Sequence, residues 1–368
     1  MKLGRLSGSV RRLGSMRRTI AALRDLPAAF GAKATGARAE RVRSSPQFDG
    51  KVFRNAAPRH PMTAGSMRTI FREMFFGEHR ELRKPAGAVP LVAAEPVLSA
   101  DGVHLTWYGH ASTLVELDGA RVLLDPVWSD RVSPAAFAGP RRLHEPPVPL
   151  SGLGRIDAVV ISHDHYDHLD LATVRALVAS SEAPFLVPLG VGAHLERWHV
   201  PAARIIELDW HEEATVAGVR FVATPAQHFS GRGITNDDTL WTSWALLGPT
   251  HRVFYSGDTG YFDGFAAIGE KHGPFDAALI QIGAYAPQWP DIHMTPEEGV
   301  AAGLDVRAKL LVPVHWATFQ LAMHPWAEPA DRVWREAKAA DLPLAIPRPG
   351  ERIDVTEPPP VDGWWQAL

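Results

Sequence analysis

Short apolar runs separated by turn residues open the part of the chain that follows residue 100. The runs at residues 103–107, 113–117 and 122–124 predict strands, and Asp118-Gly119 between the last two is typical of a hairpin turn. Farther along, apolar positions recur at the spacing of a helix. This spacing predicts helices over residues 171–180, 191–198, 262–272, 296–304 and 329–340. Strands followed by alternating strands and helices, without a G-x-G-x-x-G sequence, favour a layered α/β architecture over a dinucleotide-binding fold.

The first 45 residues differ from the rest because they concentrate positive charge. They contain eleven Lys or Arg and two acidic residues, a net charge of +9, whereas the other residues, 27 basic and 39 acidic, carry −12. Leu13, Met16, Ile20 and Leu23 form a helical apolar stripe among the arginines. Two interpretations stay open: an amphipathic segment lying on an anionic lipid surface, or a disordered basic leader. Nucleic acid is not an expected partner, because the rest of the chain is acidic.

Residues 46–99 are interrupted by Pro and by charged residues, and they contain one predicted helix at residues 64–76. The apolar side of this helix either packs on the following domain or covers a substrate groove. The sequence therefore divides into a basic tail (residues 1–45), an N-terminal extension that packs on the core (46–99) and a main domain (100–368).

Composition limits the classes of protein that the chain can form. With 368 residues and 46% hydrophobic content, the chain can bury a large core. The absence of cysteine excludes disulfides and thiolate ligands. No apolar run approaches the roughly 18 residues of a membrane span, and no signal peptide is evident. We expect a cytoplasmic or peripheral membrane protein; the sequence leaves the oligomeric state open, a homodimer included.

The side chains of His163, His165, Asp167 and His168 stand close together in Ile161-Ser-His163-Asp-His165-Tyr-Asp167-His168, at the end of the apolar run 158–161. A straight strand would send His168 to the face opposite the other three side chains, so we expect a strand end that turns into a helix. Imidazole and carboxylate groups favour zinc or a similar divalent ion over calcium or magnesium. The alternative is a solvated polar loop that binds metal adventitiously.

The H-x-H-x-D-H sequence resembles the signature of the metallo-β-lactamase superfamily, which implies a four-layer αββα fold with two metals between its sheets. The remaining ligands of that family follow strands. Each of three further candidates follows an apolar run in this sequence: His228, Asp258 and His315. The resemblance implies two divalent ions, with zinc as the first choice, and Asp258 as the bridge between them. The first ion is then bound by His163, His165 and His228, and the second by Asp167, His168 and His315.

A more specific resemblance runs from residue 105 to residue 348. It is to phospholipases D that hydrolyse N-acylphosphatidylethanolamine, and it rests on ten short motifs that occur in the same order. These motifs are residues 125–129, 139–142, 156–158, 207–210, 243–244, 257–261, 273–276, 282–285, 296–298 and 315–319. The resemblance implies catalytic roles for Asp125, Asp167 and Asp258, and substrate contacts from His293, Tyr285 and Gln281. His293 is otherwise a surface histidine before a helix. Gln281 and His211 depart from that family, which has Pro and Trp there.

These resemblances imply a metal-dependent phosphodiesterase of the phospholipase D type. It would hydrolyse N-acylphosphatidylethanolamine to N-acylethanolamine and phosphatidic acid. Two divalent ions suit this reaction, because they activate water and stabilise both the attacking and the leaving oxygen. The expected partners are a phospholipid substrate and a membrane surface. Two alternatives stay open: a hydrolase of the same fold that acts on a small phosphoester or a sugar-phosphate lactone, and a protein in which the metal is structural.

Overall fold

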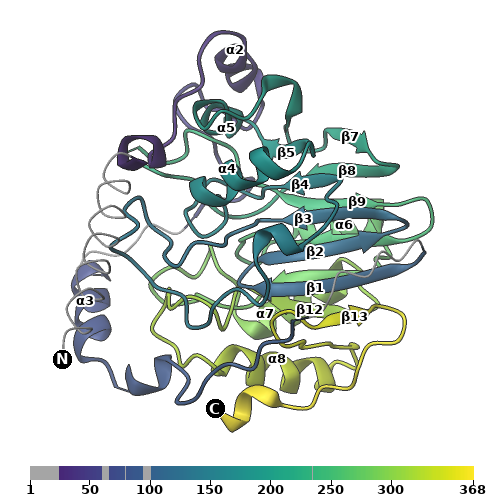
Figure 1. Ribbon diagram of the computed structural model, residues 1–368. Coiled ribbons are helices and arrows are strands. Elements are labelled where there is room, and N and C mark those ends of the chain that lie inside the picture. The colour runs from purple at the N-terminus through teal and green to yellow at the C-terminus, as the bar shows by residue number, and fades with distance from the viewer. Residues whose placement is uncertain (1–24, 60–65, 79, 94–100, 234) are drawn as a thin grey trace, which may run out of the picture.

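The computed structural model describes residues 25–59, 66–78, 80–93, 101–233 and 235–368 (Figure 1). The apolar stripe predicted at Leu13, Met16, Ile20 and Leu23 lies outside the described residues. Two β-sheets occupy the middle of the molecule, and helices lie on their outer sides (Figure 1).

The first sheet has seven strands in the order β13-β1-β2-β3-β4-β5-β6. From β13 to β3 in this order, neighbouring strands pair antiparallel. From β3 to β6, neighbouring strands pair parallel. The strands are β1 (Val103–Gly109), β2 (Ser112–Leu117), β3 (Ala120–Leu124), β4 (Ala158–Val160), β5 (Phe185–Pro188), β6 (Ile205–Leu208) and β13 (Arg352–Asp354). Residues Asp118 and Gly119 form the predicted turn between β2 and β3, and both have positive φ, as a tight hairpin turn requires.

The second sheet has six strands in the order β12-β11-β10-β9-β8-β7. Strands β10, β11 and β12 are parallel, and the remaining pairs are antiparallel. The strands are β7 (Glu213–Val216), β8 (Val219–Thr224), β9 (Ser243–Leu247), β10 (Arg252–Tyr255), β11 (Ala277–Gln281) and β12 (Leu311–Val314).

Two apolar cores show how the layers pack. The larger core joins side chains of both sheets, such as Trp107 and Phe254, to helices α6 (Gly264–His272), α7 (Pro296–Asp305) and α8 (Glu328–Ala339). The second core covers the other face of the first sheet with helices α4 (Leu171–Ser180) and α5 (Gly192–Arg197). This arrangement is helix, sheet, sheet, helix, so the predicted four-layer α/β fold is confirmed.

Local signals explain where the helices begin. The Asp170 carboxylate accepts hydrogen bonds from the backbone N–H groups of Ala172 and Thr173 and so caps α4. Helix α7 begins with a capping box between Thr295 and Glu298, and Pro296 occupies its first turn. The predicted helix boundaries agree with the structure to within two residues in the main domain.

The N-terminal extension contacts the main domain at several places. Helix α2 (Gly36–Ser44) is held by Arg38, which forms ion pairs of 2.6 Å with Glu196 and 2.5 Å with Glu207. Part of the predicted basic tail, from residue 25 onward, is therefore bound to the main domain. The division of the chain into three parts stays a prediction.

The predicted helix at residues 64–76 is observed as α3 (Ser66–Phe76), followed by the short helix η1 (Arg80–Arg83). Helix α3 stands at the edge of the molecule, apart from both sheets (Figure 1). Phe71 and Phe76 on this helix are exposed. Two interpretations of the apolar side of α3 stay predictions: it packs on the main domain, or it covers a substrate groove. Among the described residues, no helix combines the length and the apolar character needed to cross a bilayer.

Candidate metal centre

The candidate metal-binding residues come from the ends of strands in both sheets. The H-x-H-x-D-H loop lies between β4, a strand of the first sheet, and helix α4. His228, Asp258 and His315 follow β8, β10 and β12 of the second sheet. The structure therefore brings together side chains that are far apart in the sequence, as the strand-end positions predict.

The first group consists of His163, His165 and His228, whose ligand atoms lie within 4.8 Å of one another. His163 Nε2 is 2.9 Å and His228 Nε2 is 3.3 Å from His165 Nδ1. The other nitrogen of His228 donates a hydrogen bond of 2.8 Å to the Ile292 carbonyl, which leaves Nε2 with its lone pair facing the group. This geometry suits three imidazoles that share one cation.

The second group consists of Asp167, His168, His315 and His110. Asp167 Oδ2 lies 2.9 Å from His110 Nε2, 3.3 Å from His315 Nε2 and 3.5 Å from His168 Nε2. Three of these residues are the predicted second set of ligands. The structure adds His110, which is not among the predicted ligands.

Asp258 lies between the two groups. Its Oδ2 atom is 3.1 Å from Nε2 of both His168 and His315, and 3.9 Å from Nε2 of both His163 and His228. The side chain is buried. This is the position that a bridging carboxylate needs.

Asp125, also a predicted catalytic residue, is fully buried behind the second group. Its Oδ2 accepts a hydrogen bond of 2.6 Å from His168 Nδ1, and the Tyr255 hydroxyl also donates to it. Ser162 donates from its backbone N–H at 2.7 Å to Oδ1. Because His168 uses Nδ1 for this bond, its Nε2 is free to face Asp258. Asp125 thus contacts the site through His168.

The charges in the two groups differ. Burial, followed by the neighbouring imidazoles, holds the pKa of His163 and of His228 well below the usual range, so these rings are neutral. Burial also disfavours the charged forms of His168 and Asp258. However, each stabilises the charge on the other, which raises the pKa of His168 and lowers that of Asp258. The second group therefore attracts positive charge, which a divalent cation could supply in place of a proton.

Unpaired polar atoms support a cation at this place. The buried side-chain atoms without a hydrogen-bond partner in the described residues include three at this centre: His168 Nε2, Asp258 Oδ1 and His293 Nδ1. Buried polar groups are normally satisfied, so atoms left unpaired in one spot indicate a ligand. Imidazole and carboxylate groups are the usual ligands of zinc and related ions. The residues present therefore fit divalent transition-metal ions.

The three predicted substrate-binding residues have different surroundings. His293 Nδ1 lies 3.9 Å from Asp258 Oδ2, so His293 borders the metal centre. The Tyr285 hydroxyl instead donates to Glu328, at 2.7 Å. The Gln281 side chain is fully buried and hydrogen-bonds the backbone of Gly283 and Met294. Gln281 thus supports the segment that carries His293, and the substrate contacts of all three residues stay predictions.

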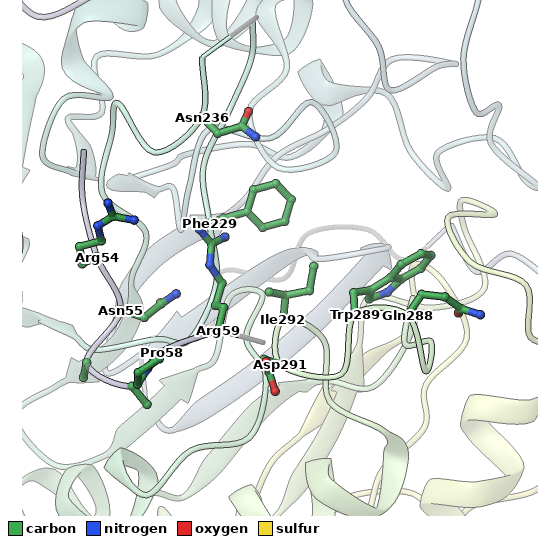
Figure 2. A pocket seen from close by; sticks show the side chains of 12 residues that line it. Arg54, Asn55, Pro58, Arg59, Phe229, Asn236, Gln288, Trp289, Asp291 and Ile292 are labelled. Atoms are coloured by element: carbon green, nitrogen blue, oxygen red, sulfur yellow. The ribbon is translucent and has the colours of Figure 1, made fainter. Parts of the chain in front are cut away.

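A cavity of about 660 Å³ opens beside the first group (Figure 2). The Phe229 ring lines it, and its centre lies 4.4 Å from that of the His165 ring. Figure 2 shows Phe229, Ile292 and Trp289 of the main domain along the cavity, with Arg54 and Arg59 from the N-terminal extension beside them. The cavity has the size of a small-molecule site and combines apolar side chains with cations.

Comparison with known proteins identifies the family. Residues 120–316, more than half of the chain, match the model of the beta-lactamase superfamily domain. The chain belongs to this superfamily. The resemblance predicted from the H-x-H-x-D-H sequence is therefore confirmed.

Individual relatives refine this assignment. An uncharacterised protein of Mycobacterium tuberculosis is 50% identical over 94% of both chains. The N-acyl-phosphatidylethanolamine-hydrolyzing phospholipase D 1 of Caenorhabditis elegans is 38% identical over 66% of this chain and 72% of its own length. A metallo hydrolase from Ignicoccus hospitalis has the same fold, with a TM-score of 0.53 and 23% identity over 68% of this chain and 97% of its own. The chain is a metal-dependent hydrolase of the metallo-β-lactamase superfamily, with a family-level link to these phospholipases.

Proposed function

We propose that the protein is a dinuclear phosphodiesterase that hydrolyses N-acylphosphatidylethanolamine-type phospholipids to N-acylethanolamine and phosphatidic acid. The observation that carries this proposal is Asp258 between two groups of metal-binding side chains, beside a cavity with apolar and basic side chains. The relative that is 38% identical supports the choice of substrate. Zinc is the proposed metal.

Each ion has its own set of proposed ligands. One set is His163, His165 and His228, and the other is Asp167, His168 and His315, with Asp258 shared. Two closed structural zinc sites would use eight protein ligands, four for each ion. The seven residues proposed here, with Asp258 shared, are fewer than eight and leave room for water. Two bound divalent ions would lower the pKa of a water molecule to near neutral and stabilise charge on the phosphate oxygens.

The protein residues then orient the reaction. Asp125 fixes the ring of His168, and the Ile292 carbonyl fixes the ring of His228, so both keep Nε2 directed at the centre. His293, which borders Asp258 and has an unpaired Nδ1, is placed to hydrogen-bond a phosphate oxygen or the leaving group. Water attacks phosphorus, the bond from phosphorus to the ethanolamine oxygen breaks, and that oxygen takes up a proton that the attacking water releases.

The side chains that line the cavity support the proposal that the substrate is a lipid with an anionic head group. Phe229, Trp289 and Ile292 offer apolar surface next to the first group, which suits an acyl chain. Arg59 lies over the Phe229 ring, with 5.5 Å from its guanidinium carbon to the ring centre, and pairs with Asp237 at 2.7 Å. A guanidinium fixed in this way suits a phosphate, because it presents several donors to the oxygens.

Hydrolysis in oxygen-18 water tests the substrate and the bond that is cut. We expect N-acylphosphatidylethanolamine to give phosphatidic acid with the label in its phosphate, detected by mass spectrometry, because water attacks phosphorus. Water-soluble phosphodiesters and sugar-phosphate lactones serve as competing substrates in parallel reactions. Diacylglycerol or a fatty acid as product would contradict phospholipase D chemistry, and faster hydrolysis of a lactone would favour the alternative function.

We also propose contact with an anionic membrane through residues 1–24. This segment contains seven Lys or Arg and no acidic residue, whereas Arg38 of α2 is paired with Glu196 and Glu207 of the main domain. Removing residues 1–24 should weaken co-sedimentation with phosphatidylserine vesicles at low salt, because each such cation contributes about 1 kcal/mol near the surface. Salt should reduce the difference.

The matched control keeps the apolar stripe and replaces the seven basic residues with Gln. If charge drives binding, this variant should sediment as poorly as the truncated protein. Hydrolysis of detergent-dispersed lipid should persist in both variants, since no proposed ligand lies in the segment. Equal sedimentation of all three proteins at low salt would refute the membrane proposal.

A further inference from the structure

The H-x-H-x-D-H sequence (residues 163–168), here called the metal-binding loop, has a second set of contacts, which its residue Asp164 makes. Asp164 stands between the proposed ligands His163 and His165, and its side chain is buried. Asp164 Oδ1 accepts a hydrogen bond of 2.7 Å from the backbone N–H of Gly231. Asp164 Oδ2 lies 3.2 Å from Nε2 of His194, a buried residue of α5. The position of this carboxylate therefore depends on His194.

His194 is in turn fixed by the N-terminal extension. Its Nδ1 accepts a hydrogen bond of 2.9 Å from the backbone N–H of Ala32. A ring nitrogen that accepts such a bond carries no proton, so the proton of the neutral ring is on Nε2 and is donated to Asp164. A continuous chain of hydrogen bonds thus runs from the extension through His194 and Asp164 to the metal-binding loop.

The part of the extension that takes part is residues 28–32, here called the strap. Gly31 has φ +73°, and a Cβ atom at this position would lie 2.0 Å from His194 Nδ1. The strap is also held by Arg232, whose Nε donates to the Ala29 carbonyl at 2.9 Å. The same guanidinium donates through Nη1 to the backbone carbonyl of Asp164 at 2.6 Å. Two separate connections therefore join the strap to the loop.

We propose that His194 is a positioning residue for the metal centre, and that it transmits the position of the strap to the metal-binding loop through Asp164. The inference rests on the proposed function, because it assumes that His163 and His165 bind metal. If Asp164 moves, its chain neighbours His163 and His165 move with it. The three imidazoles of the first group then no longer point to one position. Partners that orient metal ligands typically contribute about 10- to 100-fold in metal affinity.

Zinc affinity of the full chain, measured by competition with a chromophoric chelator, tests the role of His194. His194→Phe keeps a ring but removes both hydrogen bonds, and should weaken zinc binding by about 10- to 100-fold. His194→Gln places a side-chain N–H near the former Nε2, so it should recover most of the loss. A purely structural role would instead lower the melting temperature of the zinc-free protein without this recovery of affinity.

Asp164→Asn tests whether His194 acts through Asp164. Gly231 and His194 donate to different oxygens of Asp164, and Asn replaces one of these oxygens with an NH2 donor, so one of the two bonds is lost and this variant should also bind zinc more weakly. The double variant with His194→Phe should be no weaker than the more affected single variant, because both changes break the same connection. Additive losses would show that His194 acts by another route.

The strap itself is tested by a matched pair of glycines. Gly31→Ala must displace the His194 ring, whereas Gly36→Ala has the same type of positive φ, +54°, with nothing within 4 Å of its Cβ. We expect Gly31→Ala to weaken zinc binding at least tenfold relative to Gly36→Ala. Equal affinities in this pair, or wild-type affinity in His194→Phe, would overturn the inference and leave the proposed function intact. A wild-type protein that binds no zinc would overturn both.

Discussion

Replacing Asp258 with Asn should lower the rate of hydrolysis by about 10³-fold, which corresponds to roughly 4 kcal/mol in the barrier. Among the described residues, Asp258 lies between the two proposed sets of ligands: its Oδ2 atom is 3.1 Å from His168 and His315 of one set and 3.9 Å from His163 and His228 of the other. An amide is neutral, so it cannot balance the charge of two cations or hold them close together. Steady-state kinetics on the same lipid, with metal content measured on each preparation, gives the comparison.

His110→Ala is the matched control for this prediction. His110 also contacts the second group, through Asp167 at 2.9 Å, but it has no contact with the first. Its loss should lower the rate by about 10- to 100-fold, the range typical of residues that orient a ligand. If the Asp258 and His110 variants are equally active, Asp258 is not a bridge.

The second large effect is expected on removal of metal. The purified protein should contain close to two equivalents of transition metal, and a strong chelator should abolish its activity. Because the proposed ions would bind the folded chain and join ligands from both sheets, their removal should also lower the melting temperature. A ligand at 1,000 times its dissociation constant stabilises the folded state by about 4 kcal/mol.

Re-addition of zinc to the chelated protein is the control, and it should restore both activity and melting temperature. Magnesium should restore neither, since the first group offers only imidazole nitrogens. Elemental analysis that finds one metal or none in a fully active preparation would refute the dinuclear centre.

Much of the site could be predicted because its signals are local. His163, His165, Asp167 and His168 stand within six residues, and a buried strand precedes them. The resemblance to the superfamily implies His228, Asp258 and His315, and each follows an apolar run that the structure shows as β8, β10 or β12. The helices of the main domain were also predicted, since their apolar spacing extends over nine or more residues in most cases.

Other features depend on contacts between distant residues, which a single sequence does not display. Strands β5, β6 and β13 have three or four residues each, too few for a clear alternation. His110 directly follows β1, and the strand order β1-β2-β3-β4 within the first sheet brings it to Asp167, which follows β4. Tyr285 lies in the motif 282–285, and Gln281 directly precedes it. The Gln281 side chain hydrogen-bonds Gly283 and Met294, and the Tyr285 hydroxyl donates to Glu328. The strap's contact with His194 joins residues 162 positions apart.

The supply of ligands by both sheets has a consequence for how the protein is made. The H-x-H-x-D-H loop emerges from the ribosome early, but its partner Asp258 follows about 90 residues later and His315 later still. The first sheet also remains incomplete until β13, near the end of the chain, pairs with β1. A nascent chain can therefore offer zinc only a local cluster of side chains. The full set of proposed ligands exists only once His315 has been synthesised, so we expect metal loading to accompany the final folding of the domain.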